Sequence, residues 1–261
     1  MLLFLSVFLI ALIFSMFGLG GGLFYMPVFM FFLGDPVQAA FLSFLCIFVT
    51  AGSSAIQYLK FKKIDWKLVV FLGFPLIAMV FVSGFMIGLV NPGQTKFILG
   101  LTLILAGLSL CFPVGTLNTL SAFSRYFHKK IPLEKSNFDP LTISPLAAFV
   151  GFFCGLSGVA GGVFEVPMMI GLLRVSPHMA VGTSSMIVFL SGLLGFVSRI
   201  SAVTAEHLLD FSTVIGVLAC VFIGAQIGPA VSVGIDKKIF KRICGVFILL
   251  IGLCYIFKII F

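Results

Sequence analysis

Charged residues are scarce in this chain of 261 residues, in which Asp, Glu, Lys and Arg together make up 9%. A soluble domain carries about 25% charged residues, so the composition excludes an ordinary soluble globular protein. Hydrophobic residues make up 61% and form long runs, for example at residues 68–90 and 209–233. A helix needs about 20 apolar residues to cross the hydrocarbon core of a bilayer. The sequence therefore predicts an all-α polytopic membrane protein of the cell membrane, in contact with lipid.

Several chemical motifs are also missing. The six cysteines lie scattered in apolar segments without a CxxC spacing, and no residue cluster predicts a bound metal or cofactor. No GxxxxGK[ST] loop is present, which disfavours an ATP-driven pump. The net charge of +8 fits contact with anionic lipid, and no nucleic-acid-binding module is recognisable. We therefore expect no metal, no cofactor and no nucleic-acid partner, and the sequence leaves the oligomeric state open.

One unit of the sequence occurs twice. The segment GGLFYMP at residues 21–27 returns as GGVFEVP at residues 161–167. Four further pairs share an offset of 141: Pro36 with Pro177, Ala39 with Ala180, Ser43 with Ser184, and Phe48 with Phe189. Three more share an offset of 145: Lys96 with Lys241, Gly100 with Gly245, and Gly107 with Gly252. We predict two membrane repeats, residues 1–113 and 141–261, joined by a cytoplasmic amphipathic linker at residues 114–140.

Six segments are long enough to span a bilayer, and two others are broken. The expected spans cover residues 36–58, 68–90, 97–113, 177–198, 209–233 and 243–261. Glycine-rich stretches at residues 18–22 and 155–162 interrupt the two other segments, residues 1–33 and 141–173, and Pro27 and Pro167 follow. The arms beside each break are short for crossing a bilayer. They fit re-entrant hairpins, which enter the bilayer and leave it by the same face. Alternatively, both arms of each segment cross the bilayer, and every loop then lies on the same side as in the hairpin arrangement.

The basic residues favour the hairpins. If each broken segment counts as one span, the 16 Lys and Arg divide ten to six between the two sides, whereas with hairpins they divide thirteen to three. Positively charged loops stay in the cytoplasm, so the uneven division is the better one. Each repeat then has a hairpin and three spans, an odd number, which predicts inverted repeats. This topology places Lys63, Lys129 and Lys238 in the cytoplasm and Asn91 and Glu206 outside.

These features resemble the sulfite exporter TauE/SafE family of membrane anion transporters. The resemblance rests on the glycine-rich breaks with their following prolines, on PHMAVGTSS at residues 177–185 and on GAQIG at residues 224–228. It covers essentially the whole chain, although the first repeat has FLS at residues 41–43 where the second has GTS at residues 182–184. The resemblance implies transport of small anions, mostly sulfite, sulfonates and related organosulfur compounds.

Uncharged groups are expected to bind the anion, because no Lys, Arg or His lies near the centre of an expected span. The second arm of each hairpin starts near the midplane with unpaired N–H groups and the positive end of its dipole. Glycine lets a ligand approach the backbone, and hydroxyls of the next helix can complete the site. The predicted binding residues are Gly20, Gly21, Gly22, Ser43, Thr50, Gly161, Gly162, Thr183, Ser184 and Ser185. Alternatively, these residues only allow close helix packing.

Glu165 is the one acidic residue well inside an apolar segment, and its counterpart in the first repeat is Tyr25. An ionised carboxylate there is costly, which makes the residue a functional candidate. We expect Glu165 to carry a coupling proton or to pair with Arg174, and a purely structural role stays open. Gln57 and Gln226 are secondary candidates for coupling or gating in the same cavity.

The sequence thus predicts a secondary transporter of a small anion, which works by alternating access between the two repeats. The direction of transport stays open, and so does the choice between a proton and a sodium ion for coupling. A passive anion channel of the same fold is the main alternative. The GLSG motif at residues 155–158 also matches intramembrane serine proteases, which need a histidine base. His128, His178 and His207 all lie in loops or at segment ends, so no catalytic residue is predicted.

Overall fold

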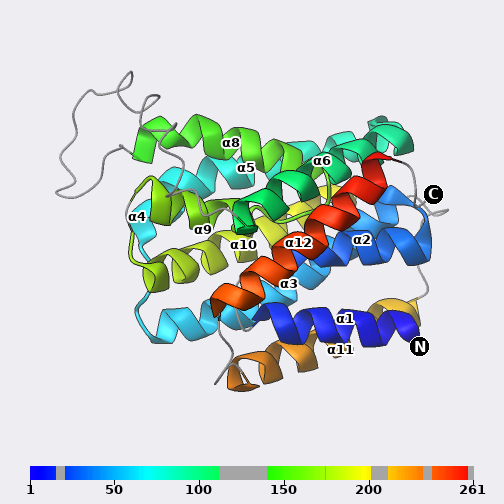
Figure 1. Cartoon of the computed structure of the whole chain (residues 1–261), viewed down its shortest axis with the longest axis horizontal. Helices are drawn as coiled ribbons and strands as arrows, with labels where there is room; N and C mark the ends of the chain where they lie inside the picture. Colours follow the sequence, from blue (N-terminus) through cyan, green and yellow to red (C-terminus); the bar gives the residue numbers. More distant parts are fainter. Residues whose placement is uncertain (16–20, 112–139, 174, 201–210, 232–236, 258–261) are drawn as a thin grey trace.

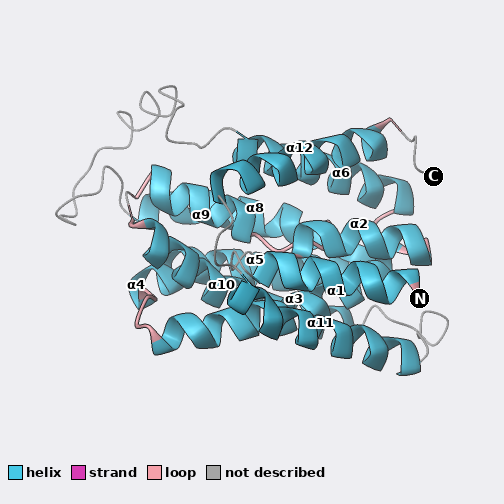
Figure 2. Cartoon of the chain, turned by 60° about the horizontal axis from the view of Figure 1, so that its bottom comes forward, coloured by secondary structure: helices cyan, strands magenta, loops and turns pink. Residues whose placement is uncertain are grey.

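The structure is a computed structural model that describes residues 1–15, 21–111, 140–173, 175–200, 211–231 and 237–257. Within these residues the fold is helical, without strands (Figure 2). The first half contains α1 (Leu2–Ser15), α2 (Gly22–Leu33), α3 (Pro36–Lys60), α4 (Trp66–Leu68), α5 (Phe74–Met86) and α6 (Pro92–Cys111). The second half contains α8 (Pro140–Leu156), α9 (Gly162–Gly171), α10 (Pro177–Ile200), α11 (Phe211–Val231) and α12 (Lys237–Ile256).

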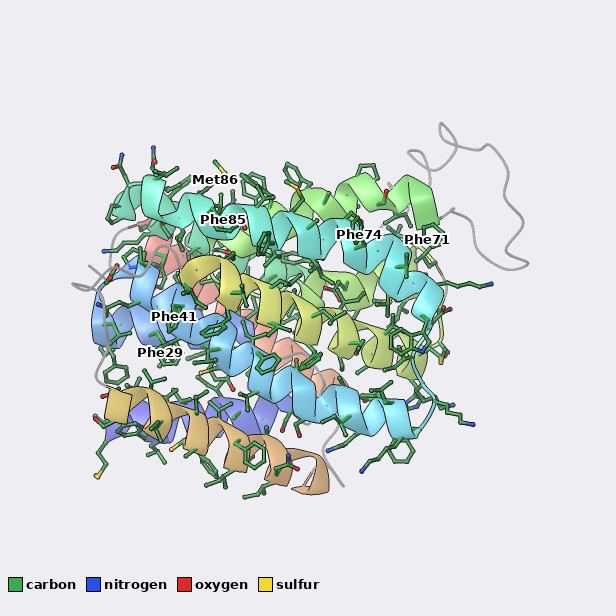
Figure 3. All side chains as sticks on the ribbon, turned by 180° about the vertical axis from the view of Figure 1, so that it is seen from behind. Phe29, Phe41, Phe71, Phe74, Phe85 and Met86 are labelled. Atoms are coloured by element: carbon green, nitrogen blue, oxygen red, sulfur yellow. The ribbon has the colours of Figure 1, made fainter. Side chains whose placement is uncertain are left out.

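The predicted all-α membrane fold is confirmed. Four helical segments are long and apolar enough to cross a bilayer: Pro36–Lys60, Trp66–Leu89, Pro92–Cys111 and Pro177–Ile200. Large apolar side chains such as Phe71, Phe74 and Phe85 point outward from the bundle (Figure 3). In water such a surface would be costly, whereas in a bilayer it contacts lipid of the same polarity.

Two predicted spans have different boundaries in the structure. The segment at residues 68–90 is not one regular helix, because a π-helical turn (Val69–Gly73) separates α4 from α5 and a 3₁₀ turn (Ile87–Leu89) ends it. Pro75 has no N–H for the preceding turn, which is a common cause of such a distortion. The span expected at residue 97 begins earlier, at Pro92, where the Asn91 carbonyl accepts from the amides of Gln94 (2.9 Å) and Thr95 (3.1 Å).

The broken segments have short arms, as predicted. Helices α1, α2, α8 and α9 contain 14, 12, 17 and 10 residues, so the longest extends for about 26 Å. Helices α1 and α2 lie toward the end of the bundle that carries the N-terminus, and Phe14 packs against Phe24 with ring centroids 4.7 Å apart (Figure 1). Helices α8 and α9 lie toward the opposite end, which carries α4 (Figure 1). The two broken segments thus occupy opposite ends of the bundle.

The two halves pack through reciprocal contacts. Helix α1 packs on α11 and helix α8 packs on α5, and these two pairs correspond under the sequence repeat. Helices α6 and α12 meet through glycines. A Cβ atom added to Gly107 would lie 2.8 Å from the Gly245 carbonyl oxygen, and one added to Gly252 would lie 3.0 Å from the Gly100 carbonyl oxygen. Gly100 corresponds to Gly245 in the sequence repeat, and Gly107 corresponds to Gly252. The contact of Gly107 with Gly245 is therefore equivalent to the contact of Gly252 with Gly100.

Helices α3 and α10 form the central antiparallel pair. Three glycine contacts show the direction of the pair: Gly195 with Phe44, Gly52 with Phe189, and Gly182 with Tyr58. The residue numbers of α3 increase from the first contact to the last while those of α10 decrease, so the two helices run antiparallel. Glycine permits this close approach, and it brings the polar residues of both helices beside the helix breaks. The amphipathic linker predicted at residues 114–140 lies, except for Pro140, outside the described residues.

Candidate functional site

The two helix breaks meet inside the bundle. A Cβ atom added to Gly22, the first residue of α2, would lie 2.8 Å from the backbone nitrogen of Ala160 in the second break. The Ser43 hydroxyl of α3 donates a hydrogen bond of 2.7 Å to the carbonyl of Gly158, which has a φ of +71°. Gly22 and Ser43 of the first half therefore lie directly at the break of the second half.

Glu165 lies in the first turn of α9 and is only 4% exposed. The Ser184 hydroxyl of α10 donates to the Glu165 Oε2 atom at 2.8 Å and lies 3.5 Å from the Gly162 carbonyl oxygen. Glu165 Oε1 is buried and has no hydrogen-bond partner among the described residues. A Cβ atom added to Gly161 would lie 3.2 Å from that oxygen. Four predicted residues are thus gathered at the start of α9.

Tyr25 occupies the equivalent place in the first half. Its side chain is fully buried, and its hydroxyl lies 2.8 Å from Thr50 Oγ1. The Thr50 hydroxyl donates to the Cys46 carbonyl at 2.8 Å, so the Tyr25 hydroxyl donates to Thr50. The Tyr25 ring also packs on Gly21, whose φ of +69° is in the left-handed region. The first break is therefore packed against a phenol where the second carries a carboxyl group.

Two predicted hydroxyls of α10 lie apart from Ser184. The Thr183 hydroxyl oxygen accepts from the backbone amide of Asp65 at 3.0 Å and so fixes the turn before α4. The Ser185 hydroxyl donates to the carbonyl of Val181, one turn earlier in the same helix, at 2.8 Å. Consecutive helical residues point about 100° apart, so three adjacent hydroxyls do not share one site.

The remaining predicted residues are less central. Gln57 is half-buried near the end of α3, and Gln226 is exposed on α11. Gly20 and Arg174, the suggested partner of Glu165, lie outside the described residues. Among the residues that the structure does describe, no group of His, Cys, Asp and Glu could hold a metal ion.

Arg199 is the residue that sequence reasoning missed. It lies in the last turn of α10, at a helix end, yet it is 0% exposed. Its Nη1 donates to the Gly195 carbonyl at 2.7 Å, and its Nη2 donates to the Gly155 carbonyl in the last turn of α8. A charged group thus lies beside the second break, where the sequence predicted only uncharged residues for anion binding. One feature of the sequence could have drawn attention to Arg199: it is one of the three basic residues on the predicted outer side, where basic residues are rare.

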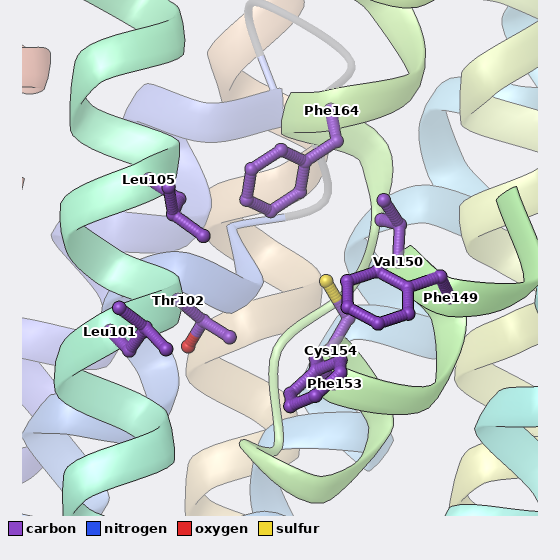
Figure 4. A pocket seen from close by; sticks show the side chains of 8 residues that line it. All are labelled: Leu101, Thr102, Leu105, Phe149, Val150, Phe153, Cys154 and Phe164. Atoms are coloured by element: carbon purple, nitrogen blue, oxygen red, sulfur yellow. The ribbon is translucent and has the colours of Figure 1, made fainter. Parts of the chain in front are cut away.

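A cavity of about 200 Å³ opens between α6, α8 and α9 (Figure 4). Its lining consists of Leu101, Thr102, Leu105, Phe149, Val150, Phe153, Cys154 and Phe164. None of the predicted binding residues lines it. An almost wholly apolar lining offers little to a small anion, which needs hydrogen-bond donors when it leaves water.

An apolar helical bundle with paired helix breaks and buried polar groups where they meet is the architecture of a multi-pass membrane transporter. The chain belongs to the sulfite exporter TauE/SafE family, whose model matches residues 3–255. The membership places the protein among transporters rather than enzymes.

Relatives in three organisms support this assignment. The chain is 30% identical over 266 residues to the probable membrane transporter protein YunE of Bacillus subtilis, covering 95% of this chain and 93% of the relative. It is 23% identical over 214 residues to the probable membrane transporter protein MJ0441 of Methanocaldococcus jannaschii, covering 79% and 74% of the two chains. A probable membrane transporter protein of Haemophilus influenzae is 21% identical over 255 residues, with 92% and 91% covered. No solved structure matches the chain.

Proposed function

We propose that this protein is a secondary transporter of a small sulfur-containing anion, such as sulfite or a sulfonate. The description of the family as sulfite exporters supports the choice of anion. The observation that carries the proposal is the contact between the two breaks, where Gly22 meets Ala160 and Ser43 bonds to Gly158. Two interrupted helices that meet inside a membrane bundle are typical of transporter binding sites.

Backbone amides and hydroxyls would bind the anion. Helices α2 and α9 begin at Gly22 and Gly162, next to the breaks, and the first N–H groups of a helix have no partner within it. These donors and the positive ends of the helix dipoles favour an anion. Ser43 and Ser184, equivalent residues of α3 and α10, supply a hydroxyl each beside the second break.

Alternating access would arise from movement of one half against the other. The proposal is supported by the antiparallel packing of α3 and α10, by the reciprocal glycine contacts and by the position of the broken segments at opposite ends of the bundle (Figure 1). These relations are those expected of inverted repeats. In this proposal, the arrangement with the breaks packed on each other would be a closed state of the cycle.

Glu165 would couple transport to protons. Its carboxyl is held by Ser184 at the first turn of α9, so it lies beside the proposed anion site. A neutral carboxyl tolerates a neighbouring anion, whereas an ionised carboxylate repels it. Binding of the anion and binding of a proton would therefore support each other.

The test is uptake by the purified protein in liposomes. Sulfite, sulfate, thiosulfate and small sulfonates are offered separately, each with and without a pH gradient. We expect saturable uptake of at least one sulfur anion, driven by the gradient, and none in empty liposomes. Uptake that never saturates and follows only the membrane potential would favour a passive channel. Uptake of none of these anions would refute the proposed function.

A further inference from the structure

We infer that Arg199, Ser83 and Ser198 form a second oxyanion-binding site, beside the last turn of α8. The inference rests on the proposed function, because the anion that Arg199 would bind belongs to the same chemical class as the transported one. The ligand class is a small anion with two or more oxygens on one centre, such as a sulfonate, sulfite or carboxylate. This site is separate from the hydroxyls and helix starts described above.

Arg199 is buried without an acidic partner among the described residues. The guanidinium is completely buried, and its hydrogen-bond acceptors are the neutral carbonyls of Gly195 and Gly155. Its Nε atom is buried without a hydrogen-bond partner, and within the described residues no carboxylate pairs with it. An unpaired buried charge is costly, so an anion would be strongly attracted to the free donor.

Two hydroxyls lie beside the guanidinium. Ser83 of α5 and Ser198 of α10 are completely buried, and they donate to carbonyls of their own helices at 2.9 Å and 3.0 Å. A Cβ atom added to Gly155 would overlap Ser83 Oγ, and one added to Gly84 would overlap Ser198 Oγ and lie 3.1 Å from Arg199 Nη1. Gly155 thus admits Ser83 beside α8, and Gly84 admits Ser198 and Arg199 beside α5. Hydroxyl protons can rotate toward a bound anion.

The geometry favours an oxyanion over a halide. A guanidinium presents its N–H groups as a planar fork that matches two oxygens of one acid group. The Phe44 ring holds this plane in place, with the Arg199 Cζ atom 4.1 Å from the ring centroid. A chloride ion offers no pair of oxygens to the fork.

Anion binding at this site would also act on the hairpin. The Gly155 carbonyl belongs to α8, the first arm of the second broken segment, and it accepts from the same guanidinium. An oxyanion that takes over the Nη2 donor would release this contact. Binding would therefore loosen α8, the arm that has to move during transport. If Arg199 served only to cap α8, an anion would not have this effect.

The first test compares the KM for sulfite uptake among variants. Removing a charged hydrogen-bonding partner weakens binding by about ten- to hundredfold, so we expect that rise in KM for Arg199→Gln. Arg199→Lys keeps the charge but not the fork, and its KM should rise less. Ser83→Ala should raise KM severalfold. Ser109→Ala is the matched control, since this hydroxyl also donates to a carbonyl three residues earlier, at 2.8 Å, and is distant in sequence from the site.

The two proposals can fail separately. If the parent protein transports sulfite and Arg199→Gln keeps the parent KM, the second site is refuted while the proposed function stands. If the parent protein transports no sulfur anion, the proposed function fails and this inference fails with it.

The second test needs no variant and so does not depend on how a variant folds. Thermal unfolding of the parent protein in detergent is followed with increasing methanesulfonate. Methanesulfonate should raise the unfolding temperature in a saturable way, whereas chloride at the same ionic strength should not. Equal unfolding temperatures with methanesulfonate and chloride would overturn the inference and leave Arg199 as a cap of α8.

Discussion

Phe48 of α3 stacks on Phe189 of α10, with ring centroids 5.0 Å apart and an angle of 20° between the ring planes. These two residues are equivalent in the sequence repeat, at an offset of 141. In the proposed inverted-repeat arrangement, the axis that relates the two halves would pass between these two rings. Any movement of one half against the other must therefore slide or separate this stack.

Valine at Gly21 or at Gly161, one glycine from each helix break, should abolish transport while membrane insertion stays intact. Gly21 has a left-handed φ, and a side chain there would strike the Tyr25 ring. A side chain at Gly161 would press on Leu76 and on Glu165 Oε1. Sulfite uptake at equal expression is the measurement. Gly93→Val is the control, because nothing lies within 4 Å of a Cβ atom at that position. Normal uptake by both hairpin variants would mean that these glycines serve packing alone.

Alanine at the same glycines should separate strain from crowding. Gly21→Ala places a side chain at a φ of +69° and should lower the free energy of unfolding by about 1–2 kcal/mol. Gly161→Ala should cost less, because its φ is −68°. Gly34→Ala isolates the strain term, since its φ is +73° and nothing lies within 4 Å of the added Cβ atom. Denaturant unfolding in detergent checks the order, and equal losses at residues 21 and 161 would contradict it.

The glycine contact between α6 and α12 should be sensitive to a single methyl group. A Cβ atom added to Gly107 would lie 2.6 Å from Leu249 Cγ and 2.8 Å from the Gly245 carbonyl oxygen. Overpacking of this kind costs about 1–3 kcal/mol. Gly107→Ala should therefore unfold at a lower denaturant concentration than Gly93→Ala. Equal unfolding midpoints for the two variants would show that α6 and α12 are not in close contact in the membrane.

Glu165→Gln should keep anion uptake but lose its dependence on a pH gradient. The amide oxygen of glutamine can accept the hydrogen bond that Ser184 gives to Glu165 Oε2, so the local structure should persist. The amide does not take up or release a proton, so coupling through this residue would end. Ser184→Ala is the companion variant, because it removes the donor and keeps the carboxyl group. Gradient-driven uptake by Glu165→Gln equal to that of the parent protein would make the carboxyl structural.

Cysteine labelling tests the predicted orientation. On a cysteine-free background, single cysteines at positions 91 and 206 should react with an impermeant reagent added outside intact cells. Cysteines at positions 63, 129 and 238 should react only after the membrane is opened. The expectation follows from the thirteen-to-three division of Lys and Arg. Labelling of position 238 from outside, without labelling of position 206, would rule out the inverted arrangement.

Much of the fold followed from the sequence, because length and repetition are visible there. The short arms beside the glycines are helices of 10 to 17 residues, and the duplicated Phe48 and Phe189 meet in space. The distortion at residues 69–73 was not predicted, although Pro75 gave a local reason for it.

The sequence does not readily predict whether a side chain points into the bundle or toward lipid, and the reason is physical. Lipid is as apolar as the interior of the bundle, so hydrophobic periodicity does not separate the two faces of a membrane helix. The sequence therefore does not show that Gln226 is exposed, or that Thr183 bonds to Asp65 and lies apart from Ser184. Arg199 directly follows the span expected at residues 177–198, and only the tertiary structure shows its side chain turning inward to Gly155.

Counterflow in liposomes tests the central claim, that a small sulfur anion crosses through a site where the two helix breaks meet. Liposomes containing the purified protein are loaded with unlabelled sulfite, and the entry of radiolabelled sulfite is followed. We predict that internal sulfite accelerates labelled entry and that Gly161→Val removes this acceleration while Gly93→Val keeps it. Acceleration that persists in Gly161→Val, or entry that internal sulfite never accelerates in the parent protein, would contradict the account.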